Sequence, residues 1–207
     1  MSSDPNDTPT VFIVDDDPAI RIAMQALMES VNLPHRIFPS GNEFLDSDCD
    51  ERPGCLVLDI RMPGLSGLEL QAELVRRGST LPIIFITGHG DVPMAVEAMQ
   101  KGAVDFIQKP FRDQDLLDRI TEALKTDEER RAQRDRHDVV AGRIKRLTNR
   151  EKEVFDLVVT GKPNKVIAYD LGVSQRTVEI HRARVMEKMQ ARSLADLVKM
   201  HLADEEV

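Results

Sequence analysis

The sequence predicts an α/β domain with a parallel, five-stranded sheet, followed by a smaller all-α domain. Over the first 125 residues, short apolar runs alternate with segments of helical periodicity, which is typical of βα repeats around a parallel sheet. After Leu147 the apolar residues recur at helical spacing alone. The chain of 207 residues is longer than one average domain and shorter than two, so a second domain of reduced size fits its length.

The strands of the predicted sheet are continuous apolar runs, as expected for strands that are covered on both faces. Apolar residues at helical spacing lie between and after these runs. The predicted strands are residues 11–14, 35–38, 56–58, 82–86 and 106–107, of which 35–38 is the weakest. The predicted helices of this domain include residues 20–31, 65–77, 92–101 and 112–124.

The charge of the chain changes along its length. The whole chain carries 28 Lys and Arg against 36 Asp and Glu, a net charge of −8, which by itself argues against a nucleic-acid partner. Residues 1–126, however, hold 21 acids and 11 bases, whereas residues 146–200 hold 7 acids and 11 bases. An acidic front and a basic rear indicate two modules with different partners.

Residues 126–144, between these modules, lose the apolar periodicity and become dense in interspersed charges. Pairs four residues apart, such as Asp127 and Arg131, favour a helical connector. A solvated, partly frayed linker fits the same composition equally well. The predicted boundaries are therefore an α/β domain over 9–125, a charged linker over 126–144 and an all-α domain over 145–207.

The all-α domain carries start and stop signals for four helices. Ser or Thr residues stand where three of these helices begin, and glycines follow the first two helices. Their order, a helix, a short helix, a glycine turn and a long helix, is the layout of a helix-turn-helix. In chain order the signals are the capping box 148–151, a stop at Gly161, a helix over 164–171, a turn at Gly172, a cap at Ser174 for a helix to residue 190, and a cap at Ser193.

Carboxylates follow directly on two of the predicted strands. Asp15 and Asp16 come after the first strand, and Asp59 ends the third. In a doubly wound parallel sheet these side chains converge beyond the carboxyl ends of the strands. A divalent cation such as Mg²⁺ relieves their repulsion and neutralises a phosphoryl group during its transfer. Asp17 differs, because its position before Pro18 is that of a helix N-cap.

Two further polar residues end the remaining strands of the predicted sheet. Thr87 closes the fourth strand, and Lys109, before Pro110, closes the fifth. A hydroxyl and an ammonium at this edge supply hydrogen-bond donors to phosphoryl oxygens. Each residue alone fits a turn or a solvated surface as well, so the interpretation depends on their combination with the carboxylates.

Four segments in this order, VFIVDDD (11–17), LVLDIRMPGLSG (56–67), FITGHGD (85–91) and DFIQKPF (105–111), carry a family resemblance. Over residues 10–124 the chain resembles the receiver domain of two-component response regulators, which has the flavodoxin-like (CheY-like) fold. The resemblance implies that Asp59 is the phosphorylated aspartate and that Mg²⁺ is bound by Asp16, Asp59 and the backbone carbonyl of Arg61, with Asp15 acting through water. It also implies that Thr87 and Lys109 are catalytic, Thr87 as the switch hydroxyl and Lys109 as the phosphate-contacting lysine. Phe106 corresponds to the aromatic switch, and the Lys109–Pro110 bond is expected to be cis. Phe106 fits a plain core residue equally well.

The long helix over 174–190 has one apolar side and one exposed side. Residues on the N-terminal part of the exposed side of a recognition helix read base edges in the major groove, and neighbouring basic or hydroxyl residues contact phosphates. A solvated basic surface is the alternative interpretation. The expected base contacts are Arg176, Glu179, Ile180 and Ala183, and the expected phosphate contacts are Lys165, Thr177, Arg184 and Lys188.

The segment LTNREKEVFDLVVTGKPNKVIAYDLGVSQRTVEIHRARVMEKM, residues 147–189, resembles the LuxR-type four-helix helix-turn-helix of the FixJ/NarL class. Together with the receiver resemblance, it is similar to the FixJ/StyR-like subgroup of response regulators. Related regulators often have lysine at the positions of Glu179 and Ala183. A glutamate cannot contact phosphate and instead accepts a hydrogen bond from cytosine N4, so a different operator sequence is expected.

These resemblances imply a DNA-binding response regulator that is not an enzyme. In such a regulator a sensor histidine kinase is expected to phosphorylate Asp59, and the receiver is then expected to change state and form a homodimer through the helix over 92–101 with its neighbouring strand or helix. The helix-turn-helix is expected to bind promoter DNA and to activate transcription with RNA polymerase. A cytoplasmic location is expected, because no apolar run spans a membrane and the first ten residues do not resemble a signal peptide. The alternatives are an Mg-dependent aspartyl-phosphate phosphotransferase and a constitutive DNA-binding regulator with a non-switching receiver.

Overall fold

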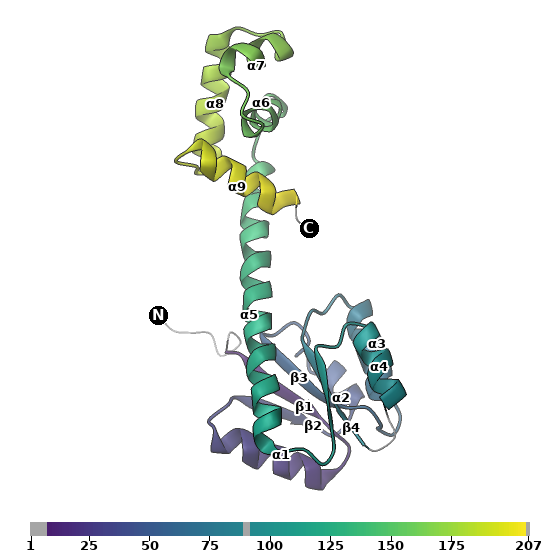
Figure 1. Ribbon diagram of the computed structural model, residues 1–207. Coiled ribbons are helices and arrows are strands. Elements are labelled where there is room, and N and C mark those ends of the chain that lie inside the picture. Colours follow the sequence, from purple (N-terminus) through teal and green to yellow (C-terminus); the bar gives the residue numbers. More distant parts are fainter. Residues whose placement is uncertain (1–7, 89–91, 206–207) are drawn as a thin grey trace. The chain divides into compact units, whose positions relative to one another are not determined.

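The computed structural model describes residues 8–88 and 92–205. The chain forms two compact units, Met1–Arg131 and Ala132–Val207 (Figure 1). The first unit contains a parallel sheet and its covering helices, and the second is wholly helical. The predicted order, an α/β domain followed by an all-α domain, is therefore confirmed.

The sheet of the first unit has five parallel strands in the order β2-β1-β3-β4-β5. In this order the direction in which successive strands are added reverses between β1 and β3, and doubly wound folds bind their ligands at such a switch point. All five predicted strands are present, and the weakest of them, β2, is an edge strand. The strands are β1 (Thr10–Val14), β2 (His35–Phe38), β3 (Gly54–Asp59), β4 (Ile83–Thr87) and β5 (Asp105–Gln108).

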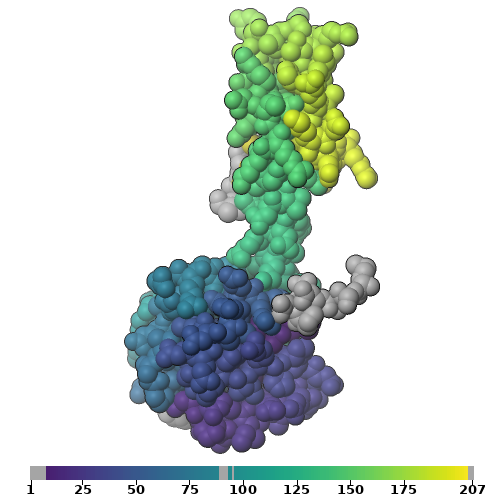
Figure 2. All heavy atoms as spheres, turned by 180° about the vertical axis from the view of Figure 1, so that it is seen from behind, coloured from purple at the N-terminus to yellow at the C-terminus, as the bar shows by residue number. Residues whose placement is uncertain are grey.

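Helices cover both faces of this sheet. Side chains of α2, α3 and α4 pack with one face of the strands, and side chains of α1 and the beginning of α5 pack with the other. In the space-filling view, the surface of this unit is the purple to blue part of the molecule (Figure 2). The short helix α2 was not predicted, because five residues are too few for an apolar period to show. The helices are α1 (Pro18–Ser30), α2 (Gly41–Leu45), α3 (Gly67–Arg76), α4 (Val92–Gln100) and α5 (Asp113–Ile144).

Helix α5 is continuous from Asp113 to Ile144, so the segment predicted as a charged connector is helical. Its turn at Asp127 belongs to the first unit. The buried Asp127 carboxylate accepts hydrogen bonds from the Gly54 amide, at 2.9 Å, and from Arg131 Nε, at 2.7 Å. Arg131 also donates to the carbonyls of Glu51 and Arg52. The predicted pair is therefore present, and it ties α5 to the start of β3.

The second unit combines the last turns of α5 with four further helices. Their apolar side chains form one core, to which α5 contributes Val140 and Ile144. Gly172, with φ of 65°, allows the left-handed turn between α7 and α8, and Ser174 caps α8 as predicted. None of the described helices is long and apolar enough to cross a membrane. The four helices are α6 (Asn149–Val159), α7 (Asn164–Leu171), α8 (Gln175–Met189) and α9 (Leu194–Glu205).

The division of the chain into two units falls between residues 131 and 132, inside the segment predicted as a linker. Arg131 donates hydrogen bonds within the first unit, and Val140 and Ile144 pack in the core of the second. The domain boundaries at 125/126 and 144/145 stay predictions.

Candidate phosphoryl-acceptor and DNA-binding sites

The carboxyl-terminal edge of the sheet brings together four of the residues singled out in the sequence. Asp59 is the last residue of β3 and is 8% exposed, and Asp15, directly after β1, is 2% exposed. Thr87, the last residue of β4, is buried. Lys109 follows β5, and its Nζ lies 3.0 Å from Asp15 Oδ2 and 2.9 Å from Asp59 Oδ1. One ammonium thus bridges the two buried carboxylates.

The backbone around Lys109 directs its side chain into this pocket. The Lys109 amide donates a hydrogen bond of 2.8 Å to the Thr87 carbonyl, which continues the pairing of β5 with β4 beyond the strand ends. The Lys109–Pro110 peptide bond is cis, as expected. The hydrogen bond at the strand end therefore holds Lys109 at the sheet edge that contains Asp59.

Hydrogen bonds also fix the orientation of the two carboxylates. Asp59 Oδ2 accepts from the Arg61 amide at 2.8 Å, and Asp15 Oδ1 accepts from the Asp17 amide at 2.8 Å. The loop after β3 returns close to Asp59 at Gly67, where a Cβ atom would lie 2.3 Å from the Asp59 carbonyl oxygen. A larger residue at Gly67 would displace this backbone, so glycine is required for the close approach.

Burial raises the pKa of the Asp59 carboxyl above its ordinary value, and the charge of Asp15 adds to this effect, while Lys109 opposes it. Burial by itself would lower the pKa of Lys109, but its hydrogen bonds to Asp59 and Asp15 raise that pKa above its ordinary value. The pocket therefore keeps a charged ammonium beside a carboxylate that has lost much of its hydration. Such a carboxylate is suited to act as a nucleophile towards a phosphoryl group, because the ammonium beside it offsets the negative charge of both groups.

The oxygen atoms at this edge fit a hard divalent cation. Asp16 directly follows Asp15 in the sequence and is exposed. Asp59 ends β3, and Arg61 lies in the loop that follows it. Both oxygens of Asp15 already accept hydrogen bonds, from the Asp17 amide and from Lys109. Within residues 8–88 and 92–205 no group of three or more His, Cys, Asp or Glu side chains is arranged as a metal site. Mg²⁺ nevertheless binds with one or two carboxylates when waters and a phosphate oxygen complete its shell.

Three further residues complete the description of the pocket. Phe106, on β5, is half-buried and packs against the core on the face of the sheet that carries α3 and α4. Asp17 caps α1 by accepting a hydrogen bond of 2.8 Å from the Ala19 amide, as predicted. Sequence reasoning missed Arg21, whose Nη1 donates to the Asp15 carbonyl at 2.8 Å. No sequence pattern could have indicated that contact, because its acceptor is a backbone atom.

Helix α8 of the second unit has the two-sided character that its sequence predicts. Val178, Val185 and Met189 are buried in the core. The opposite side is open to solvent, and even the apolar Ile180 is 47% exposed there. Thr177 is half-buried and takes part in the N-terminal cap with Ser174. The exposed side contains Arg176, Glu179, Ile180, Ala183 and Arg184, and Lys165 is exposed on α7.

Lys188 differs from the other predicted DNA contacts. Its Nζ lies 2.5 Å from Glu151 Oε2 and 3.2 Å from the Arg146 carbonyl oxygen. Glu151 is 2% exposed and closes the predicted capping box of α6, accepting from the Thr148 amide at 2.8 Å. The ammonium of Lys188 is thus held within the unit, and it joins α8 to the beginning of α6.

We expect this ion pair to contribute measurably to the stability of the second unit. Lys188 and the Thr148 amide lower the pKa of Glu151 to about 2. The stabilisation is therefore complete above the unfolded-state pKa near ~4.3 and is lost as the pH falls towards 2. Glu151→Gln should lower the free energy of unfolding at pH 7 by about 1–2 kcal/mol, since a charge-assisted hydrogen bond is weakened. Urea-dependent hydrogen exchange of α6 and α8 amides measures this difference.

The matched control is Glu153→Gln, which removes a more exposed acid from the same helix. We expect it to change the stability by less than about 0.5 kcal/mol. The difference between Glu151→Gln and the unmodified protein should also shrink between pH 4.5 and pH 2. A difference that stayed constant over this range would contradict the ion pair as its source.

A buried, lysine-bridged aspartate on a doubly wound sheet, followed by a helix-turn-helix with a basic exposed face, defines the two-component response regulators that bind DNA. Comparison with protein families agrees with this class. Residues 11–121 match the response regulator receiver domain, and residues 145–201 match the bacterial regulatory proteins of the luxR family.

Similar proteins and structures extend over nearly the whole chain. The nodulation protein W of Bradyrhizobium diazoefficiens is 49% identical over 190 residues, covering 92% of this chain and 84% of that protein. The transcriptional regulatory protein FixJ of Azorhizobium caulinodans is 47% identical over 192 residues, covering 93% and 91%. The structure of the response regulator StyR has a TM-score of 0.85 at 44% identity, covering 94% and 98%. The chain belongs to the FixJ-like response regulators, with a receiver domain and a LuxR-type helix-turn-helix DNA-binding domain.

Proposed function

We propose that Asp59 accepts a phosphoryl group and that this modification increases the affinity of the second unit for promoter DNA. The observation that carries the proposal is the position of Lys109 Nζ, 2.9 Å from Asp59 Oδ1 and 3.0 Å from Asp15 Oδ2. A buried carboxylate is thereby oriented at the sheet edge with a cation already beside it. Asp59, the acceptor, and Lys109, a hydrogen-bond donor for the phosphoryl oxygens, are therefore already side by side before the transfer.

In the transfer, an Asp59 carboxylate oxygen forms the new bond to phosphorus while the bond from phosphorus to the donor breaks. The donor group leaves with the bonding electron pair. Lys109 donates to a phosphoryl oxygen, and the Thr87 hydroxyl, at the neighbouring strand end, donates to another. Asp16, Asp59 and the Arg61 carbonyl would hold Mg²⁺, with Asp15 acting through water, and the cation would supply neutralisation of the developing negative charge.

The same two donors connect the modification to a change of state. When Thr87 and Lys109 turn to the phosphoryl oxygens, the hydrogen bonds of Lys109 to the bare carboxylates are replaced. Phe106 lies opposite Phe85 in the register of β4 and β5, and Thr87 lies opposite Gln108. Because side chains two residues apart on a strand share a face, Phe106 and Thr87 lie on the same face of the sheet, one residue pair apart. A movement of Thr87 would therefore change the space that is available to the Phe106 ring. On this ground we assign the role of switch residue to Phe106 together with Thr87.

For the second unit we assign base contacts to Arg176, Glu179, Ile180 and Ala183. Phosphate contacts are assigned to Lys165, Thr177 and Arg184. These residues lie on α7 and on the N-terminal and exposed part of α8, which is the part of a recognition helix that enters the major groove. Lys188 was expected to contact phosphate as well, but its partners on α6 and the preceding turn favour a structural role.

The proposed partners follow from this function. A sensor histidine kinase supplies the phosphoryl group, the phosphorylated receiver forms a homodimer through α4, and the bound dimer activates transcription through RNA polymerase. The protein then acts in the cytoplasm as a regulator and not as an enzyme that turns over external phosphate esters. The domains are proposed as 9–125 for the receiver, 126–144 for the linker and 145–207 for the DNA-binding domain.

The decisive experiment measures DNA binding with and without phosphorylation. The full-length protein, treated with acetyl phosphate and Mg²⁺, is first used to select duplexes from a random-sequence pool. We expect its affinity for a selected duplex to exceed that of the untreated protein by a factor of about 5–150, the usual range of an allosteric coupling. Equal affinity in both states, with the phosphoryl group on the protein, would instead support the constitutive DNA-binding alternative.

A further inference from the structure

We propose that Arg143, in the last turn of α5, is a positioning residue for DNA recognition, because it holds the C-terminal end of the recognition helix α8. This inference rests on the DNA-binding role of α8 and extends the recognition apparatus to a residue outside the helix-turn-helix. Arg143, α8 and the turn after α8 all belong to the second unit.

The contacts of Arg143 are those of a helix-end clamp. Its Nη1 donates to the Met189 carbonyl oxygen at 3.0 Å, and its Nη2 donates to Gln190 Oε1 at 2.7 Å. The last carbonyls of a helix lack partners within the helix and carry the negative end of its dipole. A guanidinium satisfies such a carbonyl and is attracted to this end, and its rigid fork binds two acceptors in a set geometry.

The backbone at this point favours a clamp that is specific to one conformation. Gln190, the C-cap of α8, has φ of 54° and ψ of 35°, a left-handed conformation that is uncommon for residues other than glycine. The Gln190 side chain is itself one of the two acceptors of Arg143. Arg143 therefore supports the uncommon conformation with which the chain leaves α8.

A second and independent contact joins the same regions. Lys188, in the last turn of α8, donates to the Arg146 carbonyl and to Glu151. Val140 and Ile144 of α5 pack in the core with Met189. The segment from Val140 to Glu151 thus contacts the end of α8 through its core and through two basic side chains.

A clamp at this end matters for the residues that read DNA at the other end. The 15 residues of α8 extend over about 22 Å, and its proposed base contacts begin at Arg176, in the first turn. A small tilt at Met189 is therefore enlarged at Arg176. Base readout needs bidentate hydrogen bonds of defined geometry, whereas non-specific phosphate contacts tolerate displacement. Removal of the clamp should weaken specific binding more than non-specific binding.

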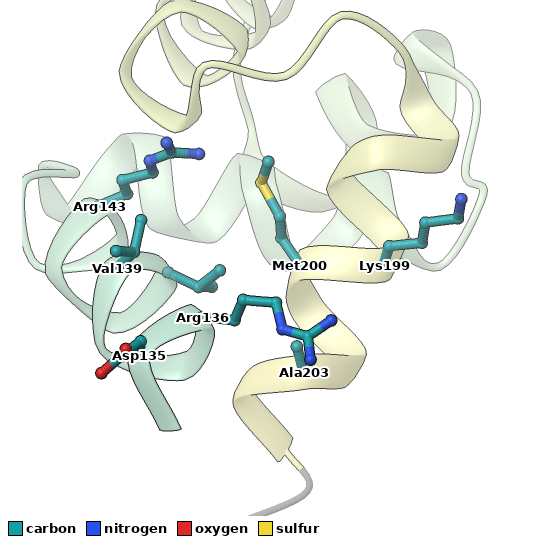
Figure 3. A pocket seen from close by; sticks show the side chains of 8 residues that line it. Asp135, Arg136, Val139, Arg143, Lys199, Met200 and Ala203 are labelled. Carbon is teal, nitrogen blue, oxygen red and sulfur yellow. The ribbon is translucent and has the colours of Figure 1, made fainter. Parts of the chain in front are cut away.

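The side chain of Arg136 offers a matched control on the same helix. Arg136 is exposed, lies two turns before Arg143, and donates to the carbonyl of Ala132 in its own helix. Figures 1 and 2 show α9 beside the last turns of α5, and Figure 3 shows Arg136 and Arg143 lying apart along the groove between these helices. Arg136→Ala and Arg143→Ala remove the same charge, and only the second removes contacts with α8.

The experiment compares full-length, phosphorylated Arg143→Ala, Arg143→Lys and Arg136→Ala proteins on a selected duplex and on a random-sequence duplex. We expect Arg143→Ala to bind the selected duplex about tenfold more weakly, while its non-specific affinity changes less than about twofold. Arg143→Lys keeps the charge but not the fork, so its affinity should be intermediate. Arg136→Ala should bind both duplexes as the unmodified protein does. Hydrogen exchange of α6 confirms that each variant is folded at the temperature of the assay.

The salt dependence separates this role from a direct interaction of Arg143 with DNA. If Arg143 bound a phosphate, Arg143→Ala would reduce the slope of log affinity against log salt by about 0.9, and both duplexes would be weakened alike. An unchanged slope with a reduced specific-to-non-specific ratio supports the clamp. The proposal is overturned if the ratio of specific to non-specific affinity does not change, whether both affinities are retained or both fall equally. A failure of the proposed DNA binding itself would look different. In that case the unmodified protein and Arg136→Ala would select no duplex at all.

Discussion

Asp59→Asn is expected to abolish phosphorylation of the protein by acetyl phosphate and, with it, the gain in DNA affinity. The amide has the size of the carboxylate, so it can keep a hydrogen bond with Lys109 Nζ through its carbonyl oxygen. It lacks the negative, nucleophilic oxygen that forms the bond to phosphorus. The other carboxylate that Lys109 contacts at this edge is Asp15, and its second oxygen is held by the Asp17 amide, so we expect no replacement acceptor.

Intact-protein mass spectrometry after treatment with acetyl phosphate and Mg²⁺ measures the phosphorylated fraction. For Asp59→Asn we expect the initial rate of phosphorylation to fall at least about a hundredfold, to the background of the assay, and a rate ratio of that size corresponds to about 2.7 kcal/mol in activation free energy. Asp17→Asn is the matched control, because asparagine caps a helix as well as aspartate does and Asp17 has no proposed role in the chemistry. Phosphorylation of Asp59→Asn at the rate of Asp17→Asn would show that another residue is the acceptor.

The double variant Arg176→Ala/Arg184→Ala is expected to lower the affinity for a selected duplex by about a hundredfold or more. Both side chains are exposed on α8, away from the buried Val178 and Val185, so their removal leaves the core intact. A base contact by arginine contributes about 1–3 kcal/mol of discrimination, and a phosphate contact adds a salt-dependent contribution of its own. The two effects are expected to combine.

The single variants distinguish the two roles. Arg176→Ala should relax sequence preference at one base position, while Arg184→Ala should weaken all duplexes alike and reduce the salt slope by about one. Arg192→Ala, which removes an exposed arginine from the turn after α8, is the control for net charge and should retain both affinity and slope. Equal behaviour of Arg176→Ala and Arg192→Ala would remove Arg176 from the proposed contacts.

Most of the fold could be predicted from local patterns in the sequence. The five strands are apolar runs that need burial on both faces, and the caps at Asp17, Thr148 and Ser174 involve residues two or three positions apart. Such features depend on near neighbours along the chain. The exception is α2, whose five residues form a helix at a position that was not predicted as one, because a single turn gains its stability from packing and not from its own periodicity.

The contacts of basic side chains were much harder to predict. Lys165 and Arg184 are exposed as expected, yet Lys188, equally basic and on the same helix as Arg184, is held by Glu151. Arg143 lies in a charge-dense segment that also fitted a solvated linker, and it nevertheless clamps α8. Composition could not distinguish exposed basic residues from those that form contacts within the protein, because the partners of Lys188 and Arg143 lie far away in the sequence.

Three features of this protein could be inferred from its amino-acid sequence: the order of the two folds, the strand ends that carry Asp15, Asp59, Thr87 and Lys109, and the exposed face of α8. Hydrophobic periodicity and local capping are properties of neighbouring residues, so they can be read before the chain is folded. The bridge of Lys109 between Asp15 and Asp59, and the contacts of Lys188 and Arg143 at the end of α8, are visible only in the folded chain. These contacts join residues that lie far apart in the sequence, so they form only when the chain is folded. At Asp15, Asp59 and Glu151 folding also buries the carboxylate, and a charged group that has lost its hydration gains more from a partner.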